Sequence, residues 1–297
     1  MKPADVIRLL MLAAIWGGSF LFTRISAPVL GPAILIECRV SLAMLLLLIV
    51  ARVMHKPLHA RAHWRHYLML GVFNTAIPFL LFAYAAQTLS ASEMSILNAT
   101  APIWGAVIGV IWKRHTVNKR SMLGLGLGII GVALVVGLDR VSTQAGAGSA
   151  IAAGLLAAFC FGFATNYAKT AKHVDSFSNA HGSMWAAALF LAPAMPFASP
   201  YASPSTGVIL AVLAVGLVCT GLALLLYFRL IRDIGATSAL TVTFLIPLFG
   251  ILWGHLFLHE VISAGMMIGA GIVLLGTALA TGFNPLTLLL QRTPDKA

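Results

Sequence analysis

Apolar stretches long enough to cross a bilayer recur along the whole chain, separated by short segments in which Pro, Gly and charged residues gather. A helix rises about 1.5 Å per residue, so about 20 apolar residues span a hydrocarbon core of roughly 30 Å. The pattern predicts helices over 5–25, 32–52, 66–89, 92–112 and 119–138, and then over 148–168, 178–197, 205–228, 236–257 and 263–282. The sequence therefore predicts an all-α integral membrane fold with ten transmembrane helices.

The composition supports the bilayer as the solvent. Of 297 residues, 60% are hydrophobic and 9% are charged, and the mean hydropathy is +0.97. A soluble domain has about a quarter charged residues and could not bury this much apolar surface. The net charge of +11 does not indicate a nucleic-acid binder, because the basic residues lie in short loops. Cys38, Cys160 and Cys219 lie in apolar segments without metal-ligand spacing, so we expect no metal and no cofactor.

The distribution of Lys and Arg predicts the orientation. Counting alternate loops puts 16 of the 19 basic residues on one side, with Arg24 and Arg140 on the other and Arg39 inside a helix. Cytoplasmic loops carry the excess of Lys and Arg. We therefore expect a multi-pass protein of the bacterial inner membrane, in contact with its lipids, with both termini in the cytoplasm.

An internal repeat divides the chain. A shift of 145 residues places glycines and prolines of the first half on those of the second, as with Gly17 and Gly162, Gly71 and Gly216, Pro102 and Pro247, Gly105 and Gly250, Gly124 and Gly269, and Gly131 and Gly276. One constant offset over so many positions is typical of duplication. The chain is thus predicted to consist of a five-helix repeat at 1–145 and a second at 146–297.

The odd number of helices in each repeat has a topological consequence. The second repeat must enter the membrane from the side opposite to the first, which gives inverted-topology repeats. Many secondary transporters have this architecture, and they expose a central site to each side in turn. A passive scaffold does not need this symmetry.

Several motifs resemble those of the drug/metabolite transporter superfamily, specifically its EamA-type carriers. They are Ala14-Ile15-Trp16-Gly17-Gly18-Ser19-Phe20, the Arg39 of the second helix, Asn98-Ala99-Thr100-Ala101-Pro102, and the Gly-rich fifth and tenth helices. The resemblance covers nearly the whole chain and is strongest to the YddG-type amino acid exporters. It implies two EamA-like units, a small-molecule substrate such as an amino acid, and transport instead of enzyme activity.

The resemblance also implies an acidic residue after the fourth and ninth helices. Glu260 fits this pattern after the ninth helix, whereas His115 occupies the equivalent position in the first half. The superfamily includes carriers of sugars, nucleotide sugars and amines as well, so the resemblance indicates transport more specifically than it indicates a substrate.

The fourth and ninth predicted helices have matching stripes of small and polar residues. The stripes are Asn98, Pro102 and Gly105 in the fourth helix, and Thr243, Pro247 and Gly250 in the ninth. In one interpretation Asn98 and Thr243 face a substrate cavity and the prolines act as hinges; in the other the stripes serve helix packing through their glycines. We predict substrate binding for Asn98 and Thr243, and hinge or packing roles for the others.

Other polar and aromatic side chains at membrane depth are candidates for the same cavity. Burying an unpaired amide or imidazole in hydrocarbon is costly, so these groups should face the bundle interior or water. Aromatic rings can stack on a substrate, although Trp and Tyr also mark the headgroup boundary. The candidates are Trp16, Asn74, Tyr84, Trp104, Asn166, His181, Trp185 and Tyr227, with Pro78 as a further hinge.

Glu37 and Arg39 are charges within the second predicted helix. Two positions apart, they point to different faces and do not pair. Arg39 lies deeper, where it either contacts backbone carbonyls or binds a substrate carboxylate. We include Arg39 among the candidate substrate-binding residues.

The predicted function is secondary transport by alternating access, exporting amino acids that include aromatic or other neutral ones. A Walker motif is absent, so direct drive by ATP is not expected. Two alternatives stay open: a carrier of sugars, nucleotide sugars or other metabolites, and an integral-membrane enzyme acting on lipids. Proton coupling through Glu37 or His181 also stays open.

Overall fold

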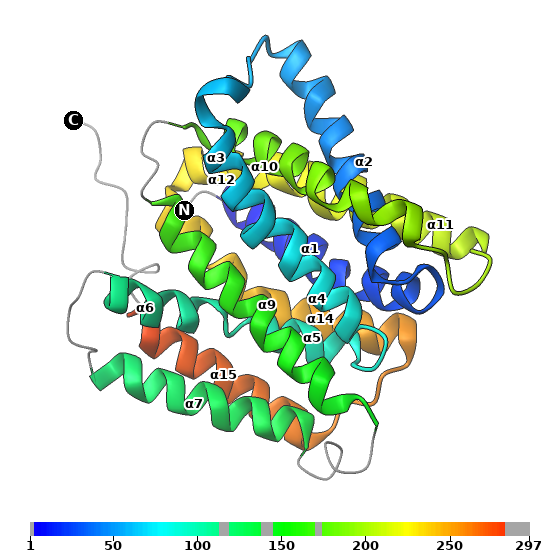
Figure 1. The fold of residues 1–297 in the computed structure, drawn as a ribbon. Coiled ribbons are helices and arrows are strands. Elements are labelled where there is room, and N and C mark those ends of the chain that lie inside the picture. The colour runs from blue at the N-terminus through cyan, green and yellow to red at the C-terminus, as the bar shows by residue number, and fades with distance from the viewer. Residues whose placement is uncertain (1–2, 113–118, 138–144, 170–173, 283–297) are drawn as a thin grey trace, which may run out of the picture.

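The computed structural model describes residues 3–112, 119–137, 145–169 and 174–282 as helices joined by turns and loops (Figure 1). The first half contains α1 (Pro3–Leu30), α2 (Pro32–Val53), an unbroken run of α3 (Ala60–Gly71), η1 (Val72–Ala76) and α4 (Ile77–Ala85), then α5 (Ala91–Asn98), α6 (Ala101–Trp112) and α7 (Lys119–Val136). The second half contains α9 (Ala147–Ala168), α10 (Ser176–Leu191) with η2 (Ala192–Phe197), a run of α11 (Thr206–Leu213), η3 (Ala214–Leu222) and α12 (Ala223–Ile234), then α13 (Ala236–Ala239), α14 (Val242–Leu258) and α15 (Ala264–Thr281). The all-α prediction is confirmed.

Prolines explain where helices depart from the predicted continuity. A turn at Ala99 and Thr100 separates α5 from α6, because Pro102 has no N–H to donate to the carbonyl of Asn98. Within this turn the carbonyl of Ala99 accepts a hydrogen bond of 2.8 Å from Thr277 Oγ1 of α15. The seventh predicted helix likewise ends in the 3-10 segment η2, whose sequence contains two prolines. The fourth predicted segment is thus two short helices, and the turn between them, at Ala99 and Thr100, is buried.

The two halves share an unusual local feature. Both η1 and η3 are π-helical, and the 145-residue offset carries residues 72–76 onto 217–221, inside η3. In η3, Thr220 Oγ1 donates a hydrogen bond of 2.7 Å to the carbonyl of Val215, five residues earlier. π-helical turns inside α-helices occur often at functional sites, and here both repeats have one at the same position.

Helix packing follows the repeat as well. Gly17 of α1 contacts Gly250 of α14, and the equivalent Gly162 of α9 contacts Gly105 of α6. These glycines let the backbones approach so closely that a Cβ at Gly162 would lie 2.6 Å from the Gly105 nitrogen. The same contact therefore occurs twice, with the halves exchanged.

The helices α7 and α15, which end the two repeats, lie side by side (Figure 1). Gly124 of α7 faces Gly276 of α15, and Gly131 of α7 faces Gly269. The repeat makes Gly124 equivalent to Gly269 and Gly131 equivalent to Gly276. Each glycine of α7 therefore contacts the equivalent of the other one, as a two-fold relation between the repeats requires. The prediction of two inverted-topology repeats is confirmed by this arrangement.

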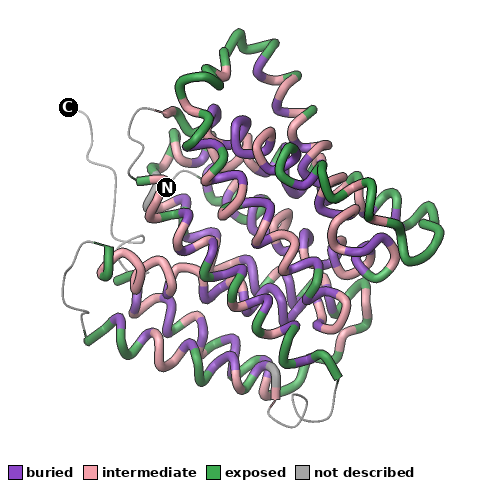
Figure 2. Tube along the Cα trace, in the orientation of Figure 1, coloured by how far each residue is buried: buried purple, intermediate pink, exposed green. Residues whose placement is uncertain are grey.

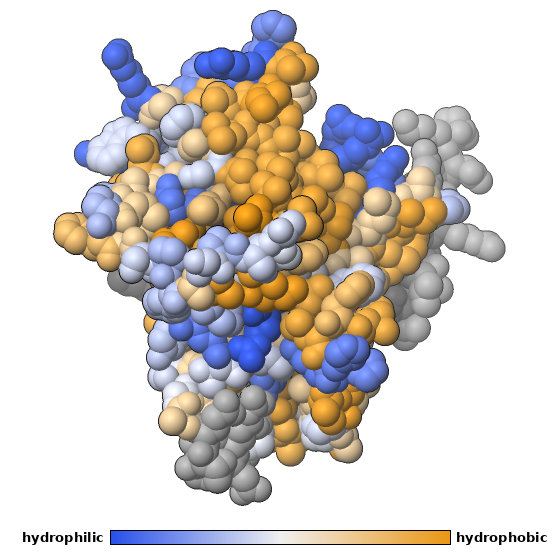
Figure 3. All heavy atoms as spheres, turned by 90° about the vertical axis from the view of Figure 1, so that its right-hand side faces the viewer, coloured by the Kyte–Doolittle hydropathy of each residue, from blue (hydrophilic) through white to orange (hydrophobic). Residues whose placement is uncertain are grey.

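The outer surface is suited to lipid. Within the described residues, seven helical spans are long and apolar enough to cross a membrane, and α14 is a shorter apolar helix. Buried residues gather where the helices cross at the centre, and exposed residues lie at the periphery (Figure 2). Hydrophobic side chains cover much of one outer face (Figure 3), and large apolar residues such as Ile111 and Leu189 are exposed. The chain is therefore a multi-pass membrane protein.

Candidate substrate-binding site

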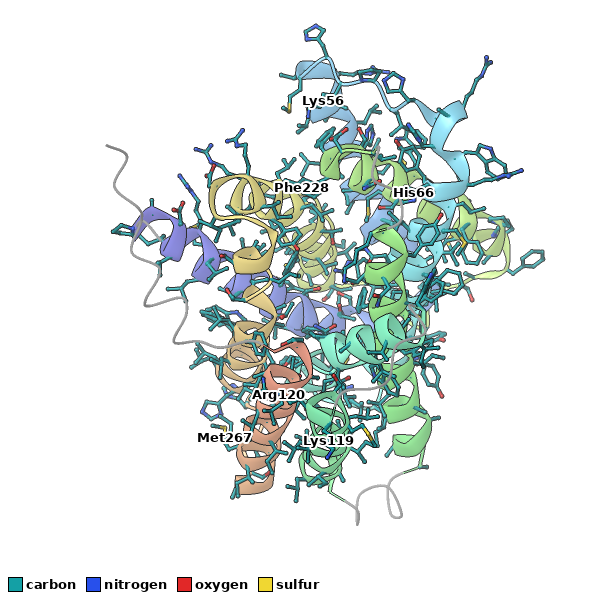
Figure 4. All side chains as sticks on the ribbon, turned by 90° about the vertical axis from the view of Figure 1, so that its left-hand side faces the viewer. Lys56, His66, Lys119, Arg120, Phe228 and Met267 are labelled. Atoms are coloured by element: carbon teal, nitrogen blue, oxygen red, sulfur yellow. The ribbon has the colours of Figure 1, made fainter. Side chains whose placement is uncertain are left out.

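A cavity of about 950 Å³ lies among the crossing helices of both repeats. Its lining extends from the helix ends at Lys169, Ser238 and Gly282 to Thr23 and Arg39 within α1 and α2. The ends of α9 and α15 lie at the end of the molecule where α7 begins (Figure 1). Figure 4 looks onto this end, with Lys119 and Arg120 labelled at the start of α7. The cavity thus reaches this end of the molecule, which we call the open end.

The opposite end is closed by α5, whose residues 91–97 are all buried. The Glu260 carboxylate, in the loop after α14, accepts hydrogen bonds from the Ala91 nitrogen at 2.7 Å, from the Ser92 nitrogen at 3.1 Å, and from Ser92 Oγ. Nearby, Arg24 Nη1 donates to the carbonyl of Ala86 at the end of α4. The Glu260 contacts join the two repeats at the closed end, where the helix N-terminus favours a carboxylate, whereas the Arg24 contact lies within the first repeat.

The lining is built from pairs of residues that the repeat makes equivalent. Each member of a pair lies 145 residues from the other, so the two repeats contribute to the same cavity from opposite directions. The pairs that line the cavity are Trp16 and Phe161, Phe20 and Thr165, Arg39 and Met184, Asn74 and Cys219, Thr75 and Thr220, Phe79 and Leu224, Phe82 and Tyr227, Asn98 and Thr243, and Ala101 and Ile246.

Most of the predicted substrate-binding residues line this cavity. They are Trp16, Arg39, Asn74, Asn98, Asn166, Tyr227 and Thr243, and they are joined there by Pro102 and Gly105 from the predicted hinge and packing set. Trp16 and Tyr227 contact each other with ring centroids 5.2 Å apart. Long-range packing has brought these seven side chains together from α1, α2, η1, α5, α9, α12 and α14.

The structure places the other candidates elsewhere. Trp104 lines a separate, smaller cavity of about 100 Å³, and the Tyr84 hydroxyl lies 3.0 Å from Ser149 Oγ in an exposed position. Trp185 Nε1 donates to His181 Nε2 at 3.0 Å within α10. None of these four side chains lines the large cavity, nor do the predicted hinge and packing residues Pro78, Pro247 and Gly250.

Arg39 is the charged side chain deep in the cavity. It is 7% exposed, its Nε donates to Thr220 Oγ1 at 2.9 Å, and its guanidinium carbon lies 3.7 Å from the centroid of the Phe79 ring. The ring supports the cation through its π-face. Because Thr220 belongs to the π-helical η3, the distorted turn holds the arginine that α2 carries.

Three of the other polar candidates in the lining differ in their hydrogen bonding. Asn166 Nδ2 donates to the carbonyls of Gly105 at 2.7 Å and Gly162 at 3.0 Å, so it links α9 to α6. Thr243 Oγ1 donates to the carbonyl of Leu240 at 2.8 Å. Among the described residues, the structure gives the Asn98 amide no hydrogen-bond partner, which leaves its donors and acceptor available to a ligand or water.

Sequence reasoning missed several residues of the lining. Examples are Thr23, Phe79, Phe82, Phe161 and Met184. The 145-residue offset was a usable signal, because it maps Trp16 onto Phe161, Tyr227 onto Phe82 and Arg39 onto Met184. Thr23 and Lys169 have no such signal, since their equivalents are not in the lining.

A cavity between inverted helical repeats, open toward one side and sealed at the other, defines a membrane carrier fold. The chain belongs to the EamA-like transporter family, whose sequence profile matches it twice, at residues 6–137 and 148–282. Its membership in this family confirms the predicted EamA resemblance.

Relatives and a solved structure agree with this assignment. The uncharacterized transporters YoaV and YvbV of Bacillus subtilis (strain 168) are 23% identical over 93% of this chain and 96% of the relative, and 25% identical over 94% and 91%. An uncharacterized transporter of Archaeoglobus fulgidus is 26% identical over 90% of this chain and 93% of its own. One crystal structure has a similar fold, with a TM-score of 0.66 at 15% identity, over 98% of this chain and 100% of that chain.

Proposed function

We propose that this membrane transporter is a secondary carrier that exports amino acids, aromatic and other neutral ones included, across the bacterial inner membrane by alternating access. The observation that carries the proposal is the cavity itself. Its paired lining comes from both repeats, and it combines aromatic walls with amides, hydroxyls and one deep cation. Such a surface suits a small molecule that has both an apolar body and a polar end.

Alternating access follows from exchange of the two repeats. In this conformation the closed end has the contact between Arg24 and Ala86. The equivalent positions at the open end are Lys169 and Ile231, and Lys169 is exposed in the cavity lining. Exchange of the repeats would close Lys169 onto the α12 backbone and free Arg24, thereby moving the cavity to the other side.

The orientation belongs to the same proposal. Arg8 Nη1 contacts Asp233 at 3.1 Å, so the start of α1 and the end of α12 lie at the same end of the molecule. With the basic loops in the cytoplasm, the cavity is inward-facing and a substrate for export enters it from the cytoplasm. We place the boundary between the repeats after residue 145. We propose transport in preference to lipid enzymology, since the polar groups gather at membrane depth instead of at one interface.

Counterflow in proteoliposomes tests the proposal. Liposomes that contain the purified protein are loaded with one unlabelled metabolite at a time, from a panel of amino acids, sugars and nucleotide sugars. Uptake of the labelled form of the same metabolite from outside is then measured. We expect uptake of neutral amino acids, lost in Asn98→Leu and Thr243→Leu and kept in Thr206→Leu at the exposed start of α11. Uptake of sugars alone would refute the amino acid proposal, and uptake that ignores a pH gradient would exclude proton coupling.

A further inference from the structure

Arg39 occupies the cavity without a carboxylate partner among the described residues. Its Nε is bonded to Thr220 and its flat face lies on Phe79, and the two Nη groups have no hydrogen-bond partner in the part of the chain that the structure describes. The equivalent residue of the second repeat, Met184, also lines the cavity but carries no charge. A guanidinium at membrane depth is costly unless an anion or acceptor pairs with it, and a carboxylate matches its donors in a bidentate way.

The described carboxylates are all engaged outside the cavity. Two of the eight acidic residues, Asp139 and Asp295, lie outside the described residues. The others bond at the protein's own helix ends or on their own helix: Asp5 and Asp233 with Arg8, Asp175 at the start of α10, Glu93 and Glu260 at the start of α5, and Glu37 with Ser41. A substrate ammonium would therefore find neutral acceptors and aromatic faces in the lining, without a negative charge.

The sign of the charge is the same along the length of the cavity. Lys169 stands at its open end and Arg39 in its depth, and both line it. Two cations in a site with apolar walls attract an anion and repel a cation, because low-dielectric surroundings strengthen both effects. One deep cation suits a single carboxylate, and the aromatic walls around it, such as Phe79, Phe82 and Phe161, suit an aromatic or bulky apolar body.

The geometry points to aromatic monocarboxylates as the substrate class, with the carboxylate bound by Arg39 and the α-amino group of an amino acid dispensable. This inference rests on the proposed carrier function and narrows it. An aromatic acid without an amino group is then carried as readily as the amino acid, whereas the corresponding amine is not. Arg39 is charged and its equivalent Met184 is not, so the two sides of the site differ in charge. The substrate therefore binds with its carboxylate toward α2.

Three probe molecules test the carboxylate and the amino group of the substrate separately. At pH 7, 3-phenylpropionate is an anion, L-phenylalanine a zwitterion and phenethylamine a cation, and all have a phenyl ring on a two-carbon chain. Binding of labelled 3-phenylpropionate to the purified full-length protein in nanodiscs is measured with each of the others as competitor. We expect phenylalanine to compete about equally and phenethylamine to be at least about tenfold weaker, because it lacks the charge-assisted pair with Arg39.

Variants of α2 test the role of the guanidinium. Arg39→Met copies the residue at the equivalent position. It should weaken the binding of 3-phenylpropionate and of phenylalanine by about tenfold or more, while the affinity for phenethylamine does not fall. Arg39→Lys keeps the charge and should retain the preference for acids over the amine. Arg52→Gln, an exposed change at the end of the same helix, is the matched control and should bind as the wild type does. Thermal unfolding of each variant checks that it is folded.

The outcomes distinguish this inference from the carrier function. Equal binding of phenethylamine, an unchanged preference in Arg39→Met, or binding of none of the three probes would overturn the inference, even if counterflow of another metabolite succeeds. Arg39-dependent binding of the acids without counterflow in liposomes would support the inference and contradict the proposed transport.

Discussion

Removal of the Glu260 carboxylate should open the closed end of the cavity. Its two oxygens accept from the Ala91 nitrogen at 2.7 Å and the Ser92 nitrogen at 3.1 Å, two of the donors that a helix start leaves without intrahelical partners. Glu260→Ala leaves both donors of the buried α5 unpaired, at a cost of about 1–3 kcal/mol each. We take about 3 kcal/mol for the pair, which shifts the balance between closed and open by about 100-fold.

Accessibility labelling measures this shift. A single cysteine at position 23, which lines the deep part of the cavity, is introduced into protein whose native cysteines are replaced. A membrane-impermeant maleimide is added on the side of Glu260, and the labelling rate should rise by up to about 100-fold in Glu260→Ala.

The matched control is Ser263→Ala in the same loop. Ser263 accepts a hydrogen bond from the Met266 nitrogen at 3.0 Å and so caps α15 instead of α5. Its removal should lower the unfolding temperature through a loss of about 1 kcal/mol but leave the labelling rate unchanged. Equal labelling rates in both variants and the unaltered parent would refute the assignment of Glu260 as the link that closes this end.

Three further predictions follow from single contacts. Arg24→Gln weakens the contact with the Ala86 carbonyl and should raise labelling from the same side by about tenfold, whereas an unchanged rate would assign closure to other contacts. Gly131→Ala puts a Cβ 2.8 Å from the α15 backbone and should lower thermal stability by about 1–3 kcal/mol; Gly126→Ala on the same helix meets open space, so an equal loss there would contradict the packing argument. Burial raises the pKa of the Asp175 carboxyl, but hydroxyl and N–H donors of α10 and a nearby lysine outweigh it and hold the pKa below its ordinary value. The stability from Asp175 is therefore complete above its unfolded pKa of about 3.9 and lost as the pH falls through the folded pKa, and Asp175→Asn should flatten thermal stability against pH in that acid range; an unaltered slope would count against it.

The repeat made much of the site predictable from local pattern. Asn98 and Thr243 were found because the same stripe recurs in both halves, and Arg39 because a charge in an apolar helix needs a partner. Both kinds of signal depend only on spacing and polarity, and all three residues line the cavity.

Other candidates show where local pattern is insufficient. Trp16 and Trp104 both lie deep in their helices, yet only Trp16 lines the large cavity, while Trp104 lines the smaller one. Asn166 and Asn98 are both amides at membrane depth. The structure bonds Asn166 to two carbonyls and leaves Asn98 without a described partner. The rotation of each helix about its axis decides these differences, and it depends on which neighbours pack against it.

By itself the sequence determined the all-α membrane fold, the two repeats and their inverted relation, because apolar length, the constant 145-residue offset and an odd helix count are properties of the chain alone. Only the tertiary structure decided that Thr220 holds Arg39, that Phe79 lies beneath it, and that Glu260 caps α5 to close one end. These contacts join residues up to 181 positions apart. They depend on how closely glycine-lined helices approach each other, which no local periodicity encodes.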